Sequence, residues 1–432
     1  MHVFDELQFL ELFFLDVHNK GHTSVVKLYE MVQRAGNVLT RLYLLITVGS
    51  VYIQSKAAPA KDILRDMVEM VKGVQQPTRG LFLRYYLVQK TKDKLPDTGT
   101  EYEGAGGTVS DAIEFIVQNW AEMVRLWVRM QHQGAVRSRK RRERERKQLR
   151  ILVGASLERL AGMDGVDLEM YRGTVLPKVL EQITNCKDAI AQHYLMDCTI
   201  QVFPDLFHLR TLEEMLTTCE ALLPDVNVKK ILVAAMNRIA EFAEEEADAI
   251  PGDINAFEIF NRHCAAIIEA RQERMGVGGV LELQAALLGF SIQAYPKHLD
   301  YVDHVLKFCS TILDAMGDEK CVAAGLNHTP LFPSSCVTPP RLSCAFRVVR
   351  PSDVPFHCPC RLDNDNMNWV VHLLTLPQET FALNVLQLNN YPKLMRFLVF
   401  SSRRYAPLSG LFTHPSHLMN QTFFFPLNNP CR

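Results

Sequence analysis

The sequence lacks the features that direct a chain into or across a membrane. Acidic residues such as Asp5 and Glu6 stand where a secretory signal needs a basic start and an uninterrupted apolar stretch. The least polar segment, residues 42–53, is broken by Thr47 and Gly49, and a spanning helix needs about 20 apolar residues. We therefore expect a cytoplasmic chain with no transmembrane segment, whose 11 cysteines are free thiols.

The sequence also lacks net charge and catalytic motifs. The formal net charge is -1, so no global field points to nucleic acid or to an anionic membrane. Neither Gly-x-Ser-x-Gly nor His-Glu-x-x-His occurs. Gly104, Gly106 and Gly107 are not followed by the Gly-Lys-Ser/Thr of a phosphate-binding loop. We expect no enzymatic activity, no cofactor and no nucleic-acid partner.

What the sequence does contain is helical periodicity. Apolar residues recur at the 3.6-residue spacing of a helix with one buried stripe within residues 113–127, 149–160 and 228–242. A single helix cannot hide such a stripe, so roughly a dozen helices before residue 320 predict stacked pairs with a continuous core. The predicted fold class is all-α: an α-solenoid of antiparallel helix hairpins, HEAT-like. The alternative is a compact all-α enzyme.

Helix starts are predicted from residues that cap the first backbone amides. Ser110 precedes the first of these stretches and Asp225 precedes the third. Thr211 and Glu214 have the spacing of a capping box, and Asn37 precedes a further apolar segment. We expect a helix to begin at each of these positions.

Residues 137–147, RSRKRRERERK, form a strongly basic run. Arg139 with Glu143, and Arg141 with Glu145, are spaced four apart, as on a solvated helix with ion pairs along its face. No aromatic residue interleaves the run to stack on bases. We interpret the run as a solvated helix. A nuclear-import signal, and with it a nuclear-transport-type helical adaptor, is the alternative.

Histidine and cysteine come close together at His357, Cys358 and Cys360. A structural zinc site needs four ligands, usually in two closely spaced pairs. Cys336, Cys344 and His372 are at hand but lack that paired spacing. We expect no metal site, with a Cys/His metal protein as the alternative.

Several stretches together resemble one known family. They read RLYLLITVG (41–49), GLFLRYYLVQ (80–89), LWVRMQHQG (126–134), RERERKQLRILVG (142–154) and IQVFPDLFHLRTL (200–212). Their order and spacing resemble the large scaffold subunit of retromer, the vacuolar protein sorting-associated protein thirty-five family. The resemblance covers about residues 3 to 320. It resumes near Trp369, with LLTLPQETFALNVLQLNNYPKLMRFL at 373–398, and fades after about Arg403.

The resemblance implies a long α-solenoid without catalytic activity, which forms the spine of an endosomal coat. Such a coat returns receptors to the trans-Golgi network or the cell surface, so the chain would be cytoplasmic and peripheral on the endosomal membrane. The implied partners of its N-terminal part are an arrestin-like subunit and a late-endosomal Rab-family GTPase. Sorting nexins and cargo tails would be contacted indirectly. The metallophosphoesterase-like subunit binds a C-terminal region that is missing here, so we expect that contact to be lost.

The resemblance also implies a binding motif for the arrestin-like subunit, Pro-Arg-Leu-Tyr-Leu-Leu. The matching residues are Arg41, Leu42, Tyr43, Leu44 and Leu45. Thr40 replaces the proline, at a first-turn position where proline is tolerated but not required. Leu42 and Leu45 follow the helical period and should lie in the core. Arg41 and Tyr43 are the residues expected to contact the partner or to shape its binding surface.

Composition changes near residue 320. The first 320 residues hold 8 of the 21 prolines and the last 112 hold the other 13. The expected organisation is a retromer-scaffold-like α-solenoid (1–320), an irregular Pro/Cys-rich insert (321–366), a short family-like helical segment (367–403) and an irregular tail (404–432). A frameshifted or unspliced segment would explain the insert, with a disordered insertion as the alternative. The chain would then be a truncated scaffold or a non-functional truncated gene product.

Overall fold

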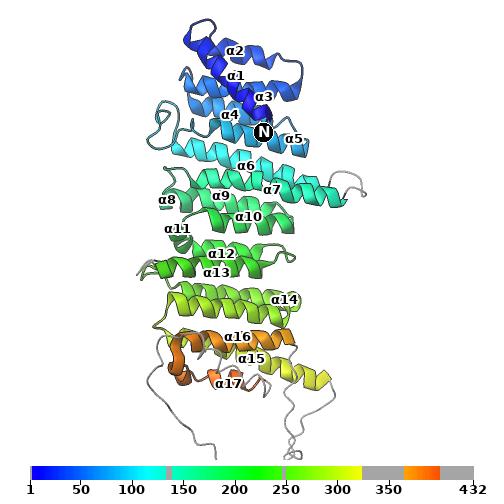
Figure 1. Ribbon diagram of the computed structural model, residues 1–432, viewed down its shortest axis with the longest axis vertical. Helices are drawn as coiled ribbons and strands as arrows, with labels where there is room; N and C mark the ends of the chain where they lie inside the picture. The colour runs from blue at the N-terminus through cyan, green and yellow to red at the C-terminus, as the bar shows by residue number, and fades with distance from the viewer. Residues whose placement is uncertain (1, 133–138, 246–249, 324–363, 399–432) are drawn as a thin grey trace, which may run out of the picture. The chain divides into compact units, whose positions relative to one another are not determined.

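The computed structural model describes residues 2–132, 139–245, 250–323 and 364–398. Every regular element within these ranges is a helix and none is a strand (Figure 1). The chain divides into two compact units. Unit 1 comprises residues 1–238 with 251–259, and unit 2 comprises 239–250 with 260–432. The predicted all-α class is confirmed.

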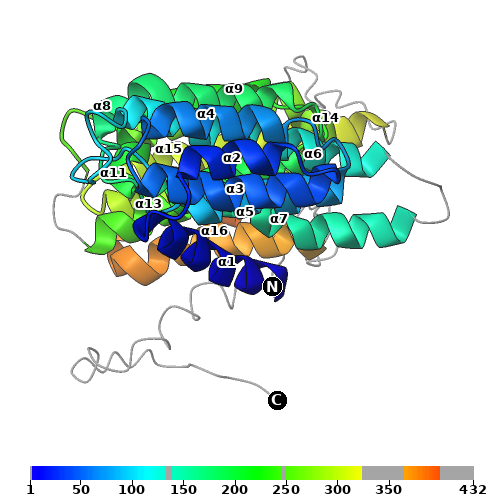
Figure 2. The same ribbon diagram turned by 90° about the horizontal axis from the view of Figure 1, so that it is seen from above.

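Unit 1 begins with seven helices that pack in pairs. They are α1 (His2–Asn19), α2 (Val25–Gln33), α3 (Val38–Gln54), α4 (Ala60–Val71), α5 (Pro77–Thr91), α6 (Val109–His132) and α7 (Arg139–Ala161). Sequence neighbours such as α2 and α3, or α6 and α7, contact each other, and so do α1 with α3, α3 with α5, and α5 with α7. The odd-numbered helices therefore form one layer, opposite α4 (Figure 2). This is the hairpin stacking that the periodicity predicts.

The rest of unit 1 continues with shorter elements. They are α8 (Leu168–Met170), the π-helical turn η2 (Tyr171–Val175), α9 (Leu176–Asn185), α10 (Ala189–Val202), α11 (Asp205–Arg210), α12 (Leu212–Ala221) and most of α13 (Val228–Glu245). The predicted stripes face the core: Trp120 and Trp127 of α6 are each 1% exposed. Burial of such aromatic side chains contributes about 2 to 3 kcal/mol each.

Two of the predicted helix starts are displaced. At α6 the cap is Thr108 rather than Ser110: the Thr108 amide donates to Asp111 Oδ2 at 2.8 Å, and the Asp111 amide donates to Thr108 Oγ1 at 3.4 Å. At α13 the Asn227 side chain accepts from the amide of Lys230 at 3.3 Å, two residues after the predicted Asp225. Each helix is present where its stripe predicts it, and at α6 the predicted capping residue was wrong.

The capping box predicted at Thr211 is also wrong. The Thr211 hydroxyl donates to the carbonyl oxygen of Phe207 at 2.8 Å, in the preceding helix α11. No side-chain hydrogen bond from Thr211 caps α12. Because α11 and α12 adjoin with only Thr211 between them, the hydroxyl bonds backward along the chain, a common alternative for threonine.

Unit 2 contains the end of α13, most of α14 (Ala256–Ala294), α15 (Leu299–Ala323), α16 (Asn364–Phe381), the 3-10 helix η3 (Ala382–Gln387) and α17 (Tyr391–Met395). Two helices meet within α14 at Gly276, whose φ of 63° suits a residue without a Cβ. The family-like segment packs on α15, where the side-chain amide of Asn390 donates to Asp303 Oδ2 at 2.7 Å. Within the segment, Tyr391 of α17 donates to the Leu374 carbonyl oxygen of α16 at 3.2 Å.

One apolar helix was not singled out from the sequence. Residues Arg274–Ala294 in unit 2 are long and apolar enough to cross a membrane by length and composition. However, 56% of the most apolar window is buried within the structure, and Leu281 and Leu287 are each 0% exposed. This burial is typical of the core helix of a packed helical unit.

Some predictions fall on residues outside the described ranges. These are the His357–Cys360 cluster, most of the insert predicted at 321–366, and the tail predicted at 404–432. Helix α15 runs through Ala323 and α16 begins at Asn364. The interpretation of the intervening segment as an insert therefore stays a prediction.

Candidate functional site

The motif residues lie in the first two turns of α3. Asn37 caps this helix as predicted, since its side-chain oxygen accepts from the amides of Leu39 at 3.0 Å and Thr40 at 3.3 Å. Thr40 therefore occupies the first turn, where a proline would break no hydrogen bond within the helix and would remove only the bond from the Thr40 amide to Asn37. The Thr40 substitution does not disturb the start of the helix.

Helix α3 divides the motif between core and surface. Leu42 is 4% exposed and Leu45 is 1% exposed, so both pack inside, as the helical period predicts. Tyr43 and Leu44 are half-buried. Arg41 is also half-buried, and its guanidinium donates to the Gln33 carbonyl oxygen at the end of α2 at 3.4 Å.

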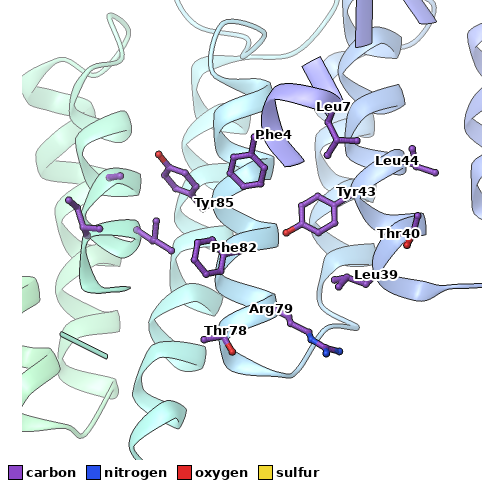
Figure 3. Close-up of a pocket in the computed structure, with 13 residues that line it drawn as sticks. Phe4, Leu7, Leu39, Thr40, Tyr43, Leu44, Thr78, Arg79, Phe82 and Tyr85 are labelled. Carbon is purple, nitrogen blue, oxygen red and sulfur yellow. The ribbon is translucent and has the colours of Figure 1, made fainter. Parts of the chain in front are cut away.

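Tyr43 and Leu44 line an apolar groove of about 850 Å³ that is formed by α1, α3, α5 and α7. Phe4 of α1, Phe82 and Tyr85 of α5, and Ile151 of α7 contribute further walls. In Figure 3 the rings of Phe4, Tyr43, Phe82 and Tyr85 gather around one hollow. We call this surface the aromatic groove.

The aromatic groove exposes large apolar side chains. Phe82 is 42% exposed and Ile151 is 68% exposed. Arg79 is the one charged side chain among the described residues that line it. An apolar surface of this kind on a folded protein marks a site for a protein partner or an apolar ligand.

Aromatic contacts connect the motif to the neighbouring helices. The ring centroid of Phe4 lies 4.8 Å from that of Tyr86 and 6.4 Å from that of Tyr43, and Tyr43 and Tyr86 are 5.3 Å apart. Burial raises the pKa of the Tyr43 phenol, so this hydroxyl stays neutral at physiological pH. The groove wall is thus an uncharged set of rings that can contact apolar groups.

Charged residues fix α1, and therefore Phe4, in place. The carboxylate of Glu11 accepts from Lys90 at 2.7 Å and from Lys94 and Ser50 at 2.6 Å each. Burial alone would raise the pKa of Glu11, but the hydrogen bonds from Lys90, Lys94 and Ser50 hold it below its ordinary value. We call Glu11, Ser50, Lys90 and Lys94 the α1 clamp.

Three stretches that resemble the family meet at the groove. Residues 41–49 supply Tyr43, residues 80–89 supply Phe82 and residues 142–154 supply Ile151. All three stretches carry the family resemblance, but the sequence predicts a binding site only at the first. Phe4 lies outside all of them, and no sequence signal marked it.

Comparison with known proteins places the chain in a family. The family model "Vacuolar protein sorting-associated protein 35" matches residues 1–411. The chain belongs to the vacuolar protein sorting-associated protein 35 family.

The curated relatives of this family are longer proteins. Vacuolar protein sorting-associated protein 35A of Arabidopsis thaliana is 52% identical over 319 residues, which cover 73% of this chain and 40% of the relative. The Dictyostelium discoideum protein is 52% identical over 310 residues, 72% of this chain and 39% of the relative. Protein 35B of Arabidopsis thaliana is 44% identical over 403 residues, 92% of this chain and 45% of the relative. This chain thus spans less than half the length of these relatives.

Residues 139–147 of the basic run form the first turns of α7, and their structure is partly as predicted. Arg139 pairs with Glu143 at 2.9 Å and Arg141 with Glu145 at 2.7 Å, all on exposed side chains. Arg146, in contrast, is only 5% exposed. The interpretation of the run as a solvated face is therefore wrong at this residue.

Proposed function

We propose that this chain is a non-catalytic scaffold of the retromer cargo-recognition complex, and that its aromatic groove binds the arrestin-like subunit. The complex would sort proteins from endosomes to the Golgi or the plasma membrane, with the chain cytoplasmic and peripheral on the endosomal membrane. Contacts with a late-endosomal Rab-family GTPase, and indirect contacts with sorting nexins and cargo tails, belong to the same proposal.

One observation carries this proposal: Tyr43 and Leu44, the half-buried apolar residues of the family-like motif, lie in the wall of a wide apolar groove. The buried half, Leu42 and Leu45, explains why the motif also has a structural role. An interface centre of exposed aromatic side chains beside one arginine has the composition of a protein-binding hot spot. Membership of the family agrees with a scaffold role.

A binding experiment with matched surface variants tests the proposal. Phe82 is 42% exposed in the groove, and Leu206 is 43% exposed on α11 and does not line it. We expect Phe82→Glu to weaken binding of the purified arrestin-like subunit by about tenfold or more, because it places a charge in an apolar contact. Leu206→Glu should leave the affinity within about twofold.

The motif itself is tested by Arg41→Trp in the same assay. This change removes the hydrogen bond to the Gln33 carbonyl and should also weaken binding. No binding by the unchanged protein, or equal losses for Phe82→Glu and Leu206→Glu, would overturn the assignment of the groove. Circular dichroism of each variant establishes that the helices are intact.

A further inference from the structure

A second pocket in unit 1 lies beside the first turns of α7, which contain the basic residues 139–147. It has a volume of about 370 Å³ and is lined by Gln131 of α6, by Ile190 of α10 and by one face of α7. On α7 the lining residues are Arg139, Arg142, Glu143 and Arg146. We call this the arginine pocket. It shares no lining residue with the aromatic groove.

The three arginines reach the pocket because of their spacing. Arg139, Arg142 and Arg146 are three and then four residues apart, so they project from the same side of a helix. Arg141, which belongs to the same basic run, falls outside this spacing and does not line the pocket. The arginines that line the pocket therefore occupy one face of α7, and Arg141 lies outside that face.

The Arg146 side chain is buried and is held by contacts with neighbouring residues. Its guanidinium pairs with Asp188 at 2.5 Å, where the side chains are only 6% and 7% exposed, and lies 4.8 Å from the centroid of the Trp127 ring. The indole N–H of Trp127 donates to the carbonyl oxygen of Arg146 at 2.9 Å. These contacts hold one guanidinium in a fixed position, which a site for a specific anion requires.

The same side chain has a buried donor without a partner. The Nε of Arg146 is buried and makes no hydrogen bond to any described residue. This atom is closed to solvent, so a ligand in the pocket does not reach it. The Nη1 of the same guanidinium donates to the Gln131 side-chain oxygen at 2.5 Å, so Arg146 contributes fixed positive charge to the pocket wall, and the exposed Arg139 is the arginine that can turn to a ligand.

The charges on the pocket favour an anion. Three arginines and one glutamate line it, and Asp188 balances Arg146. Arg139 is held by Glu143 only through an exposed pair, with side chains 75% and 57% exposed. An exposed pair of this kind is worth little, so the Arg139 guanidinium can turn to a ligand that carries more charge than one carboxylate.

We propose that the arginine pocket binds a phosphate-bearing small group, of the chemical class of a phosphorylated inositol. Guanidinium groups bind phosphate oxygens through paired, charge-assisted hydrogen bonds. The volume of the pocket lies within the range of small-molecule sites. The group can be a free phosphorylated inositol or the headgroup of a lipid, and the experiment distinguishes these two sources.

Calorimetric titration of the full chain with inositol trisphosphate, in about 0.15 M salt, tests the site with matched variants. Arg139→Gln should weaken binding by about fivefold or more, because it removes a charge that lines the pocket. Arg141→Gln removes the same charge from the same helix, also in an exposed pair, and should change the affinity by less than about twofold. Glu143→Gln should tighten binding, and Glu145→Gln should not.

Sedimentation with phosphatidylcholine vesicles, with and without a phosphorylated phosphatidylinositol, identifies the source of the group. Sedimentation that is lost in Arg139→Gln and kept in Arg141→Gln assigns a lipid headgroup. Titration that shows the same dependence without sedimentation assigns the free molecule. Equal losses in the two variants, competition by inositol that lacks phosphate, or no binding in either arm would overturn the proposal.

Discussion

The phenolic oxygen of Tyr86 lies 2.8 Å from the hydroxyl oxygen of Thr47, in a buried hydrogen bond between α5 and α3. The Thr47 hydroxyl also lies 2.8 Å from the Tyr43 carbonyl oxygen, to which it donates. Because Thr47 has only one proton to give, Tyr86 must be the donor to Thr47. The ring that contacts Phe4 and Tyr43 is thus fixed by a directed hydrogen bond.

Removal of this hydroxyl should destabilise the protein without abolishing binding. Tyr86→Phe leaves the Thr47 oxygen short of one donor, and we expect a loss of about 1 kcal/mol in the free energy of unfolding. Tyr85→Phe, at the adjacent groove residue whose hydroxyl makes no such bond to a described residue, should lose less than about 0.5 kcal/mol. Denaturant unfolding followed by circular dichroism measures both. Equal losses would contradict the directed hydrogen bond.

The α1 clamp should decide whether α1 stays docked. Glu11→Gln leaves Lys90 and Lys94, which are 13% and 15% exposed, without a carboxylate, and we expect a cost of about 3 kcal/mol. The amides of α1 should then exchange with solvent faster in hydrogen-exchange mass spectrometry, and binding at the groove should weaken because Phe4 is displaced.

A matched change on the same helix provides the control for the clamp. Asp16 pairs with Lys20 on exposed side chains, 55% and 60% exposed, so Asp16→Asn should cost less than about 0.5 kcal/mol. Because hydrogen bonds depress the pKa of Glu11, its contribution is present above pH 4.5, its ordinary pKa, and is lost as the pH falls through the depressed value. Unchanged exchange of α1 in Glu11→Gln would refute the role of the clamp.

Gly80 in the first turn of α5 should not tolerate alanine, although alanine usually favours a helix. A Cβ at this position would lie 2.8 Å from the Val74 carbonyl oxygen and 2.7 Å from Leu126 Cδ1. The backbone oxygen cannot easily move, so we expect Gly80→Ala to destabilise by about 1 to 2 kcal/mol. Gly289→Ala in α14, where a Cβ would meet no atom within 4 Å, should instead stabilise by about 0.5 to 1 kcal/mol. Thermal midpoints of the two variants should shift in opposite directions.

Stability should depend on pH through His208. Burial, followed by the charge of Arg238, lowers the pKa of His208 from 6.5 to about 4, and its Nε2 lies 3.0 Å from the Ile200 carbonyl oxygen. Between about pH 4 and pH 6.5, His208 is therefore protonated in the unfolded chain but not in the folded chain. Stability is greatest above pH 6.5 and falls as the pH drops toward 4, by about 3 kcal/mol at most.

Unfolding midpoints between pH 4 and 7 measure this effect. His208→Gln carries an amide instead of a titrating ring, so the part of the slope that is due to this residue should vanish in the variant. A slope that is the same in both proteins would assign the pH dependence to other groups.

The helices were predictable from sequence because their signal is local. The stripes at 113–127, 149–160 and 228–242 each lie on one helix, and periodicity alone identifies them. The caps at α6 and α12 were less predictable, because several residues near a helix start can bond to the backbone. At α6 Thr108 caps in place of Ser110, and the Thr211 hydroxyl bonds backward to Phe207.

The aromatic groove was only partly predictable. The likeness of residues 41–49 to a known motif located Tyr43, and the helical period correctly assigned Leu42 to the core. Phe4 and Ile151 are separated from Tyr43 by about 40 and 110 positions in the sequence, and only the packing of α1 and α7 brings them together. In the sequence, Arg146 is only one charge in a basic run. Its burial depends on contacts with Trp127 and Asp188, and no local sequence pattern links these residues to it.

Helix α7 carries residues of both the arginine pocket and the aromatic groove. Arg142 and Ile151 are nine positions apart, which is about 14 Å along a helix axis. A ligand that shifts α7 at the arginine pocket must also move the part of α7 that lines the aromatic groove. A phosphorylated inositol would then change the affinity for the groove partner by some factor. Thermodynamic linkage requires that the groove partner change the affinity for the inositol by the same factor.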